Sequence, residues 1–276
     1  MAVTTEAVLR TEELDGQPAA WREAPVPDGQ IPTLYVHGVP TNSDLWIPFL
    51  ERTGGIAPDL PGFGRSGKRG DLDYTMEGYD RWIERFLAWR DIDRFNLVVQ
   101  DWGGVALLTA QRFPERVGRL VVFNAVPLLP GYRWHRIARA WRTRGLGEFA
   151  VGLLNRFVLK QASRESNATK GPMPAPFLDL VADHMDQGTQ RAILRLYRTS
   201  PPEKLAAAGA GLKDVDCPAL VLWGQEDPYI PARFGPAYAD ALGNADHVPV
   251  PGAGHWPWYD RPDLIDTVVD FLHGDA

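Results

Sequence analysis

Residues 98–104 constrain the fold of this chain more strongly than any other segment. An apolar run of strand character is followed at once by Asp101 and Trp102, and then by two glycines that lead into an apolar stretch of helical character. A strand that turns into a helix within so few residues needs small residues at the turn, and it lifts one side chain, here Asp101, into a cleft. The sequence therefore predicts a sheet with a reactive carboxylate at one strand end.

A carboxylate at this position favours a particular chemistry. Most turns of this kind present a serine, which attacks esters and amides. A carboxylate is a poor nucleophile toward those groups, but it can attack a saturated carbon that bears a leaving group. An isolated aspartate before a helix is more often an N-cap. The interpretation of Asp101 therefore depends on partners elsewhere in the chain.

Short apolar runs alternate with helical patterns along most of the sequence. We expect strands over residues 33–37, 55–59, 95–100, 119–125, 219–224 and 247–251, and helices over residues 75–90, 103–113 and 262–272. The Asp15-Gly16 pair between strands at 3–10 and 17–24 predicts an N-terminal hairpin. Such alternation is typical of βαβ units, so the expected fold is α/β, with a mostly parallel central sheet flanked by helices.

Residues 127–214 do not show this alternation of strands and helices, and they contain no convincing strand. The spacing of Trp134, Ile137 and Trp141 predicts one helix, whose arginines we interpret as a solvated face. Further helices are expected over residues 155–166 and 177–197. We therefore predict a core domain formed by residues 1–126 and 215–276, with an inserted helical cap domain at 127–214.

Composition disfavours several classes of protein. The 276 residues carry a formal net charge of −6, which argues against nucleic-acid and anionic-membrane partners. The one cysteine, Cys217, permits no intrachain disulfide. The first residues lack the pattern of a signal peptide, and no apolar run approaches the roughly 18 residues that span a bilayer. We expect a cytoplasmic protein, and the cap tryptophans, if exposed, would support a homodimer.

Two further acid–base residues follow predicted strands. Asp227 comes shortly after the strand at 219–224, and His255 lies in a glycine-rich loop after the last strand. Functional residues of open α/β sheets collect at the carboxyl ends of the strands, so Asp101, Asp227 and His255 are expected to meet in one crevice. The order nucleophile, acid, base along the chain supports this grouping.

A fourth element follows the strand at 33–37. The sequence His37-Gly38-Val39-Pro40 allows close backbone approach to the turn at Asp101. The backbone N–H groups of Val39 and Trp102 are therefore predicted to form an oxyanion hole with two donors.

Together these motifs resemble the α/β-hydrolase superfamily, in particular its epoxide hydrolase and haloalkane dehalogenase branch. The matching segments are residues 37–40, 59–66, 100–104, 223–227 and 254–257. The resemblance covers nearly the whole chain, and it is weakest in the cap. It implies an α/β-hydrolase fold with a helical cap, a small apolar organic substrate, and neither cofactor nor metal.

The resemblance also implies a reaction in two steps. Asp101 attacks an electrophilic carbon and forms an alkyl ester. His255, oriented by Asp227, then removes a proton from a water molecule that hydrolyses the ester. A metal role for His255 is disfavoured because no second ligand lies at metal-binding spacing. His37, Pro40 and Trp256 are expected to line the substrate pocket.

The leaving group separates two activities. An epoxide opens to an alkoxide, and the resemblance implies that cap tyrosines protonate it, with Tyr197 as the stronger candidate and Tyr132 as the weaker one. A halide leaves as a free ion and needs two N–H donors. Trp102 offers one indole N–H, and Trp134 or Trp141 would have to offer the second, because Val39 stands where one dehalogenase subgroup has asparagine. The sequence favours the epoxide hydrolase over the haloalkane dehalogenase.

Other functional classes fit less well. A serine esterase is disfavoured by the aspartate at the turn, and a fluoroacetate dehalogenase by Trp102, where that family has arginine. A non-catalytic small-molecule receptor on the same scaffold would usually have lost part of the catalytic triad. Here all three members, Asp101, Asp227 and His255, are present. Production of a diol from an epoxide, or of bromide from a bromoalkane, distinguishes both enzymes from the receptor.

Overall fold

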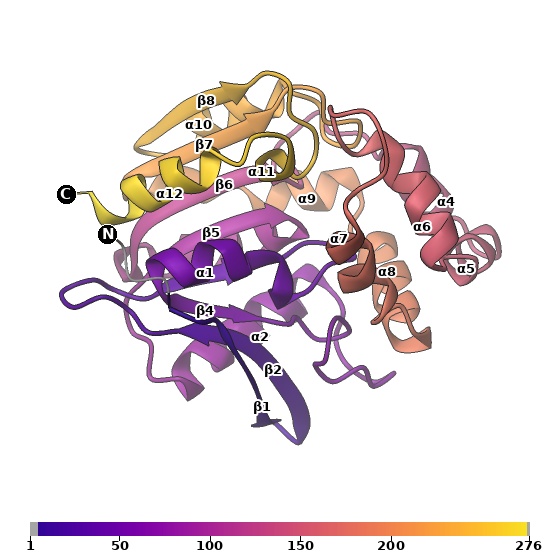
Figure 1. The fold of residues 1–276 in the computed structure, drawn as a ribbon, viewed down its shortest axis with the longest axis horizontal. Helices are drawn as coiled ribbons and strands as arrows, with labels where there is room; N and C mark the ends of the chain where they lie inside the picture. Colours follow the sequence, from indigo (N-terminus) through magenta and orange to yellow (C-terminus); the bar gives the residue numbers. More distant parts are fainter. Residues whose placement is uncertain (1–4, 275–276) are drawn as a thin grey trace.

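The computed structural model describes residues 5–274, and within them the strands form one eight-stranded sheet in the order β1-β2-β4-β3-β5-β6-β7-β8 (Figure 1). The strands are β1 (Val8–Leu14), β2 (Gln17–Ala24), β3 (Thr33–Val36), β4 (Gly55–Pro58), β5 (Phe95–Asp101), β6 (Val117–Ala125), β7 (Ala219–Gly224) and β8 (Ala245–Val250). β3 to β8 are mutually parallel. At one edge of the sheet, β2 runs antiparallel to both of its neighbours, β1 and β4. The predicted fold class is therefore confirmed.

Helices cover both faces of the sheet because alternate strand residues point to opposite sides. In β5, Leu97 and Val99 pack in the cluster that holds α2 (Met76–Trp89), α3 (Ala106–Arg112) and α10 (Phe234–Ala241). Val98, which lies between them, packs instead with α1 (Ile47–Thr53), α11 (Pro257–Asp260) and α12 (Leu264–His273). The central strand β5 is thus buried on both faces, which explains its nearly continuous apolar sequence.

Between β6 and β7 the chain forms helices and no strand anywhere in this fully described stretch. They are α4 (Arg136–Arg142), α5 (Leu146–Gly152), α6 (Arg156–Ala162), α7 (Ala175–Ala182), α8 (Gln187–Thr199) and α9 (Pro202–Ala208). Figure 1 shows α4 to α8 to one side of the sheet, beyond the carboxyl ends of β3, β5 and β6. The position agrees with the predicted cap, although its status as a separate domain stays a prediction.

Short 3-10 helices complete the connections of the chain. They are η1 (Ser43–Trp46), η2 (Trp102–Val105), η3 (Pro114–Arg116), η4 (Ser163–Glu165) and η5 (Leu212–Asp214).

Two predicted element boundaries are wrong. The first strand begins at Val8 rather than at residue 3, because pairing extends outward from the Asp15-Gly16 turn, where Leu14 pairs with Gln17; residues 1–4 lie outside the described part of the chain. The helix expected over 177–197 is two helices. Asp186 starts the second one by accepting a hydrogen bond from the Thr189 backbone N–H at 2.9 Å, which gives the new helix its N-cap.

The cap tryptophans are not exposed. Trp134 and Trp141 have 7% and 8% of their surface accessible, because both pack around the ring of Tyr197. The argument for a homodimer from exposed tryptophans is therefore wrong.

Candidate active site

Asp101 occupies a strained turn at the carboxyl end of β5. Its φ angle is 51°, in the left-handed region that residues other than glycine seldom adopt. Two glycines make room for this turn. A Cβ on Gly38 would collide with the Asp101 side chain, and a Cβ on Gly103 would collide with the Val36 carbonyl oxygen. The turn is therefore possible only because the sequence places glycine at both sites of close approach.

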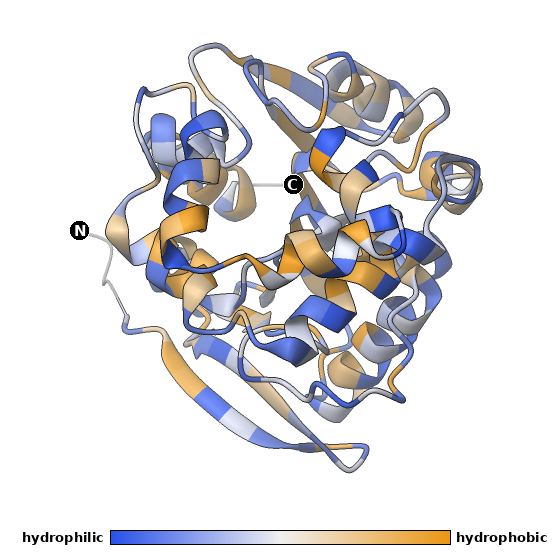
Figure 2. Ribbon diagram, turned by 90° about the vertical axis from the view of Figure 1, so that its right-hand side faces the viewer, coloured by the Kyte–Doolittle hydropathy of each residue, from blue (hydrophilic) through white to orange (hydrophobic). Residues whose placement is uncertain are grey.

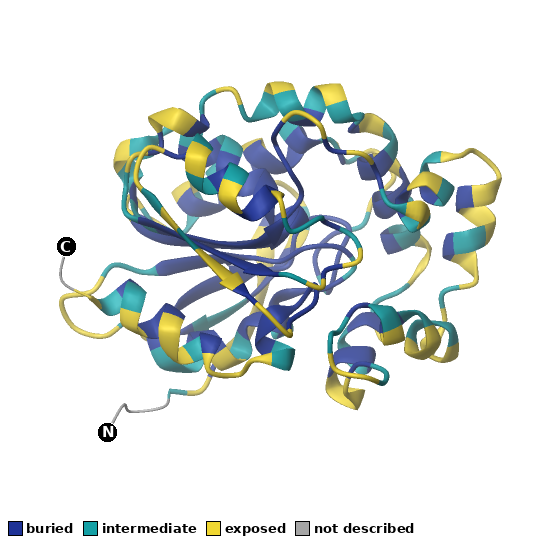
Figure 3. Cartoon of the chain, turned by 90° about the horizontal axis from the view of Figure 1, so that it is seen from above, coloured by how far each residue is buried: buried dark blue, intermediate teal, exposed yellow. Residues whose placement is uncertain are grey.

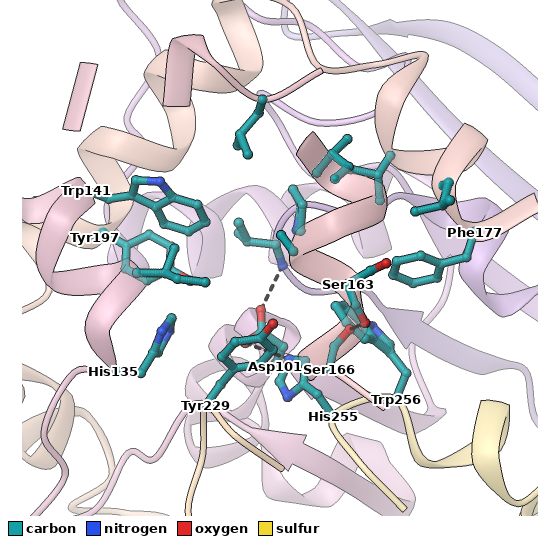
Figure 4. Close-up of a pocket in the computed structure, with 18 residues that line it drawn as sticks. Asp101, His135, Trp141, Ser163, Ser166, Phe177, Tyr197, Tyr229, His255 and Trp256 are labelled. Atoms are coloured by element: carbon teal, nitrogen blue, oxygen red, sulfur yellow. Dashed lines mark hydrogen bonds and ion pairs between the residues drawn. The ribbon is translucent and has the colours of Figure 1, made fainter. Parts of the chain in front are cut away.

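The two Asp101 oxygens face different partners. Oδ1 accepts a hydrogen bond of 2.8 Å from the Val39 backbone N–H, drawn as a dashed line in Figure 4. Oδ2 lies 3.4 Å from His255 Nε2. Trp102 begins η2 directly after Asp101. The Val39 N–H thus points at the carboxylate as expected, whereas the role of the Trp102 backbone N–H stays a prediction.

Asp227 holds the opposite side of the His255 ring. Its Oδ2 accepts hydrogen bonds from His255 Nδ1 at 2.8 Å and from Asn124 Nδ2 at 2.7 Å. Its Oδ1 accepts from the backbone N–H groups of Tyr229 and Ile230 at 2.7 and 3.0 Å. A carboxylate with this many donors is fixed in orientation.

The neighbours of the triad hold its loops in place. Glu226, which precedes Asp227, accepts a hydrogen bond from the Ala253 N–H at 3.0 Å and does not contact the His255 ring. The Gln100 side-chain amide donates to the His255 carbonyl at 3.2 Å and lies 3.1 Å from His255 Nε2. These contacts connect the end of β5 with the loop after β8.

The electrostatic environment determines the charge of His255. Burial by itself lowers the pKa of this imidazole, but the Asp227 carboxylate, together with Asp101, outweighs burial and raises the pKa to about 10. His255 in the unreacted protein is therefore an imidazolium held between two carboxylates. Any reaction that removes the charge of Asp101 also removes one of the interactions that keep His255 protonated.

Asp101 and His255 lie at one side of a cavity of about 120 Å³ beneath the cap (Figure 4). Its wall is mostly apolar and comes from both core and cap. The lining residues outside the triad include Val39, Pro40, Trp141, Phe177, Tyr197 and Trp256. Such a cavity suits an uncharged organic molecule of small size.

Four of the residues predicted for the cap side and the wall line this cavity, namely Tyr197, Trp141, Trp256 and Pro40. Tyr197 is packed against the rings of Trp102, Trp134 and Trp141 with centroid distances of 5.0–5.1 Å. The Trp102 indole N–H is buried, and the group beside it that can accept a hydrogen bond is the Tyr197 hydroxyl. Burial raises the pKa of the Tyr197 phenol well above its usual value, so this phenol is a neutral donor.

Four residues predicted for the leaving group or the pocket do not line the cavity, namely Tyr132, Trp134, His37 and Trp102. The Tyr132 hydroxyl points toward the Tyr229 carbonyl at 3.5 Å. The Trp134 indole N–H donates to the Ser200 carbonyl at 3.1 Å, so it is not free for a leaving group. His37 is fully buried, and its Nε2 accepts the Leu60 N–H at 2.9 Å, which leaves its ring with a structural role.

Among the wall residues that sequence reasoning missed, two carry ionisable rings, His135 and Tyr229. The Tyr229 ring packs edge-on against His255 with centroids 5.1 Å apart, and against His135 at 5.0 Å. Burial lowers the pKa of His135 to about 4, so this second imidazole is neutral near pH 7. The position of Tyr229 two residues after Asp227 was a usable signal, whereas nothing in the sequence distinguished His135 from a surface histidine.

Known proteins are similar to this chain in sequence. Residues 32–262 match the family model of the alpha/beta hydrolase fold. A haloalkane dehalogenase of Mesorhizobium japonicum is 30% identical over 86% of this chain and 82% of its own length. Haloalkane dehalogenase 1 of Mycobacterium tuberculosis is 33% identical over 74% of this chain and 71% of its own.

Solved structures agree with the sequence relatives. A putative ancestral haloalkane dehalogenase superposes with a TM-score of 0.78 at 26% identity, and covers 96% of this chain and 98% of its own. The haloalkane dehalogenase DbeA from Bradyrhizobium elkani has a TM-score of 0.82 at 23% identity, with 98% of both chains covered, and shows the fold alone. The chain therefore belongs to the α/β-hydrolase superfamily, in the branch of the haloalkane dehalogenases and epoxide hydrolases, and it is a hydrolase.

Proposed function

We propose that this hydrolase cleaves the carbon–halogen bond of a small apolar haloalkane through a covalent ester on Asp101. The observation that carries the proposal is the placement of the Asp101 carboxylate at the side of an apolar cavity, with Oδ2 3.4 Å from His255 Nε2. An apolar wall admits an uncharged electrophile and removes water from the carboxylate, which favours attack on saturated carbon.

In the first step, Asp101 Oδ2 forms a bond to the carbon that bears the halogen, and the halide leaves with the bonding electron pair. His255 does not act as a base in this step, because no proton is transferred. The carboxylate becomes a neutral alkyl ester.

In the second step, that loss of charge prepares His255 as a base. Without the negative charge of Asp101, the pKa of His255 falls from its raised value, because one of its two stabilising carboxylates is gone. His255 first releases its proton to solvent. As a neutral imidazole it then takes a proton from water, and the hydroxide attacks the carbonyl carbon of the ester. The Val39 N–H, 2.8 Å from Oδ1 in the free protein, stabilises the oxyanion. The ester breaks to release an alcohol, which keeps the second proton of the water, and His255 is again the imidazolium of the unreacted protein.

The halide assignment rests on the relatives and on Trp102. The relatives of 30% and 33% identity carry the name haloalkane dehalogenase, which supports this activity better than the epoxide hydrolase favoured by the sequence motifs. The buried Trp102 indole N–H lies beside the Tyr197 hydroxyl, and a departing anion could accept hydrogen bonds from both groups. Val39 offers no side-chain N–H, so we assign the second donor to the neutral Tyr197 hydroxyl, whose ring packs against Trp102.

Epoxide opening is the second candidate, and Tyr197 is the observation that favours it. A neutral phenol in the cavity wall can give its proton to an alkoxide. Tyr132, the predicted second tyrosine, lies outside the wall, so this arrangement has one phenol rather than two. Both candidates share the ester on Asp101 and differ only in the leaving group.

One experiment tests the shared mechanism. Under single turnover with excess enzyme in ¹⁸O-labelled water, the first alcohol or diol carries unlabelled oxygen from Asp101, and the label enters the Asp101 carboxylate. Solvent label in the first product would refute the ester. The same reaction with a bromoalkane and with a styrene-oxide-like epoxide, read out as bromide or diol, separates the two candidates.

The second step is expected to fail first as the pH falls. An imidazolium cannot accept a proton, so below the pKa of His255 in the ester the hydrolysis rate falls about tenfold for each pH unit. Attack by Asp101 needs no base and continues. Rapid quenching followed by intact mass measurement should therefore show more alkylated enzyme at acidic pH than at neutral pH. An equal amount at both would contradict the role of His255.

The Tyr197→Phe variant is expected to be slower by about tenfold or more in the first step, if one hydrogen bond of about 1.5–3 kcal/mol to the leaving anion is lost. Tyr132→Phe is the matched control, because this ring is also buried in the cap but lies outside the cavity wall. Stopped-flow single turnovers measure the step. Equal rates in the two variants would remove Tyr197 from the site.

A further inference from the structure

Helices α5 and α6 and the loop between them expose large apolar side chains to solvent. Leu146, Phe149, Leu153 and Phe157 are 51%, 66%, 49% and 71% exposed, and we call these four residues the docking face. The remaining large apolar residues exposed within residues 5–274 are Val8, Leu9 and Val248, each below 40%. These three lie on the edge strands β1 and β8, so the strongest exposure is confined to one part of the cap.

The docking face follows from the amphipathic pattern of α5. Leu146, Phe149 and Leu153 follow one another at helical spacing, so they point to one side of this helix. The other side of the same helix packs inward, where Val151 is 1% exposed. Figure 2 presents this side of the molecule to the viewer with apolar segments on its cap helices, and Figure 3 shows exposed segments in the same region.

The sequence around the docking face is strongly basic. Residues 133–170 contain nine Lys and Arg but only two acidic residues, Glu148 and Glu165, although the whole chain has a net charge of −6. Both acids are already paired, Glu148 with Arg198 and Glu165 with Arg136.

Several of these basic side chains have no acidic partner. Within the described residues, no carboxylate forms an ion pair with the exposed side chains of Arg139, Arg144, Lys160 or Arg164. The basic charge of this part of the cap is therefore available to an external anionic surface.

A second copy of the chain is a poor occupant of this surface. A two-fold dimer through the docking face would place two basic surfaces against each other, and like charges at an interface are repulsive. An anionic bilayer fits both properties, because apolar side chains insert at the boundary of headgroups and acyl chains while Lys and Arg contact lipid phosphates.

We propose that the docking face binds this protein to the surface of an anionic phospholipid bilayer. The same segment also contributes Leu154, Leu159 and Ala162 to the cavity wall. Docking therefore brings the lipid phase next to the wall of the catalytic cavity, so that an apolar substrate dissolved in lipid has a short path to Asp101. The negative net charge of the whole chain argues against a membrane partner, but it does not describe this region, which is locally basic.

Vesicle flotation tests the proposal. The full-length protein should float with vesicles of phosphatidylglycerol and phosphatidylcholine, bind pure phosphatidylcholine at least about tenfold more weakly, and lose affinity as salt is added. The double variant Phe149→Ser/Phe157→Ser should bind the anionic vesicles at least about tenfold more weakly, because both apolar anchors are lost. Leu9→Ser/Val248→Ser is the matched control, with apolar residues removed from strands remote from the cap, and should bind normally.

Charge variants complete the test, together with light scattering, which measures the oligomeric state in solution. Arg144→Gln/Lys160→Gln should weaken vesicle binding by about tenfold, whereas Arg94→Gln on the core should not. Circular dichroism establishes that each variant is folded. Absence of binding to anionic vesicles by the unaltered protein, or unchanged binding by the phenylalanine double variant, would overturn the proposal. A dimer in solution that the phenylalanine variant dissociates, without vesicle binding, would overturn it in favour of self-association.

Discussion

Replacing Asp101 by asparagine is expected to reduce turnover by about 10⁴-fold or more, the scale of loss when a hydrolase is deprived of its nucleophile. An amide oxygen is uncharged and cannot form the alkyl ester. The fold should persist, because the new side chain has nearly the same volume and its oxygen can still accept the Val39 N–H bond that Oδ1 accepts at 2.8 Å. Steady-state assays of bromide or diol release measure the loss.

The control for this variant is Asp246→Asn, which changes an exposed carboxylate on β8 and should leave turnover unchanged. Mass spectrometry of the Asp101→Asn variant must exclude hydrolysis of the introduced amide back to aspartate, because partial reversion would mimic residual activity. Turnover equal to that of the unaltered protein, in a sample free of reversion, would show that Asp101 is not the nucleophile.

Replacing His255 by glutamine is expected to separate the two steps. Glutamine cannot take a proton from water, so ester hydrolysis should fall by about 10²–10⁴-fold, while attack by Asp101 continues. The enzyme should then accumulate as an alkyl ester, and peptide mass spectrometry should locate the added mass on the peptide that contains Asp101. The lost contact at 3.4 Å between His255 Nε2 and Asp101 Oδ2 is not needed for the attack itself.

Two further variants serve as controls for the His255→Gln result. Asp101→Asn/His255→Gln should show no adduct, because the nucleophile is absent. Gln100→Ala should retain the base and lose the contacts of the Gln100 amide with the His255 carbonyl at 3.2 Å and with His255 Nε2 at 3.1 Å, so it should turn over without accumulating ester. If His255→Gln binds the substrate but remains unmodified, the covalent mechanism is wrong for this protein.

No helix within residues 5–274 is long and apolar enough to cross a bilayer. The proposed association with a membrane occurs at its surface, through the docking face of α5 and α6. The salt dependence of vesicle binding and the effect of Phe149 and Phe157 are independent of the reaction on Asp101, so failure of either proposal leaves the other standing.

The motifs around the strand ends predicted most of the core. The turn at Asp101, the hairpin at Asp15-Gly16 and the succession of strands along the chain follow from local patterns of apolar residues and glycines, since each depends on a few neighbouring positions. The same patterns predicted that Asp101, Asp227 and His255 meet. The contacts of 2.8 and 3.4 Å agree with that expectation, although catalysis by these residues stays a proposal.

The cap was less predictable because its contacts are not local. The break at Asp186 between α7 and α8 depends on one capping hydrogen bond. The Trp134 indole N–H is occupied by Ser200, which is far away in the sequence. Neither feature can be recognised from the spacing of apolar residues along the sequence. That spacing indicates that a helix has an apolar face, but not what the face contacts.

The amino-acid sequence by itself determined the α/β core and the identity of the charged groups at its strand ends, because strand alternation, glycine turns and residue chemistry act over short distances along the chain. Only the tertiary structure decided which cap side chains reach the cavity: Tyr197 and His135 line it, and Tyr132 and Trp134 do not. It also decided that Phe149 and Phe157 face solvent. The physical reason is that burial depends on packing between distant segments, which no local pattern specifies.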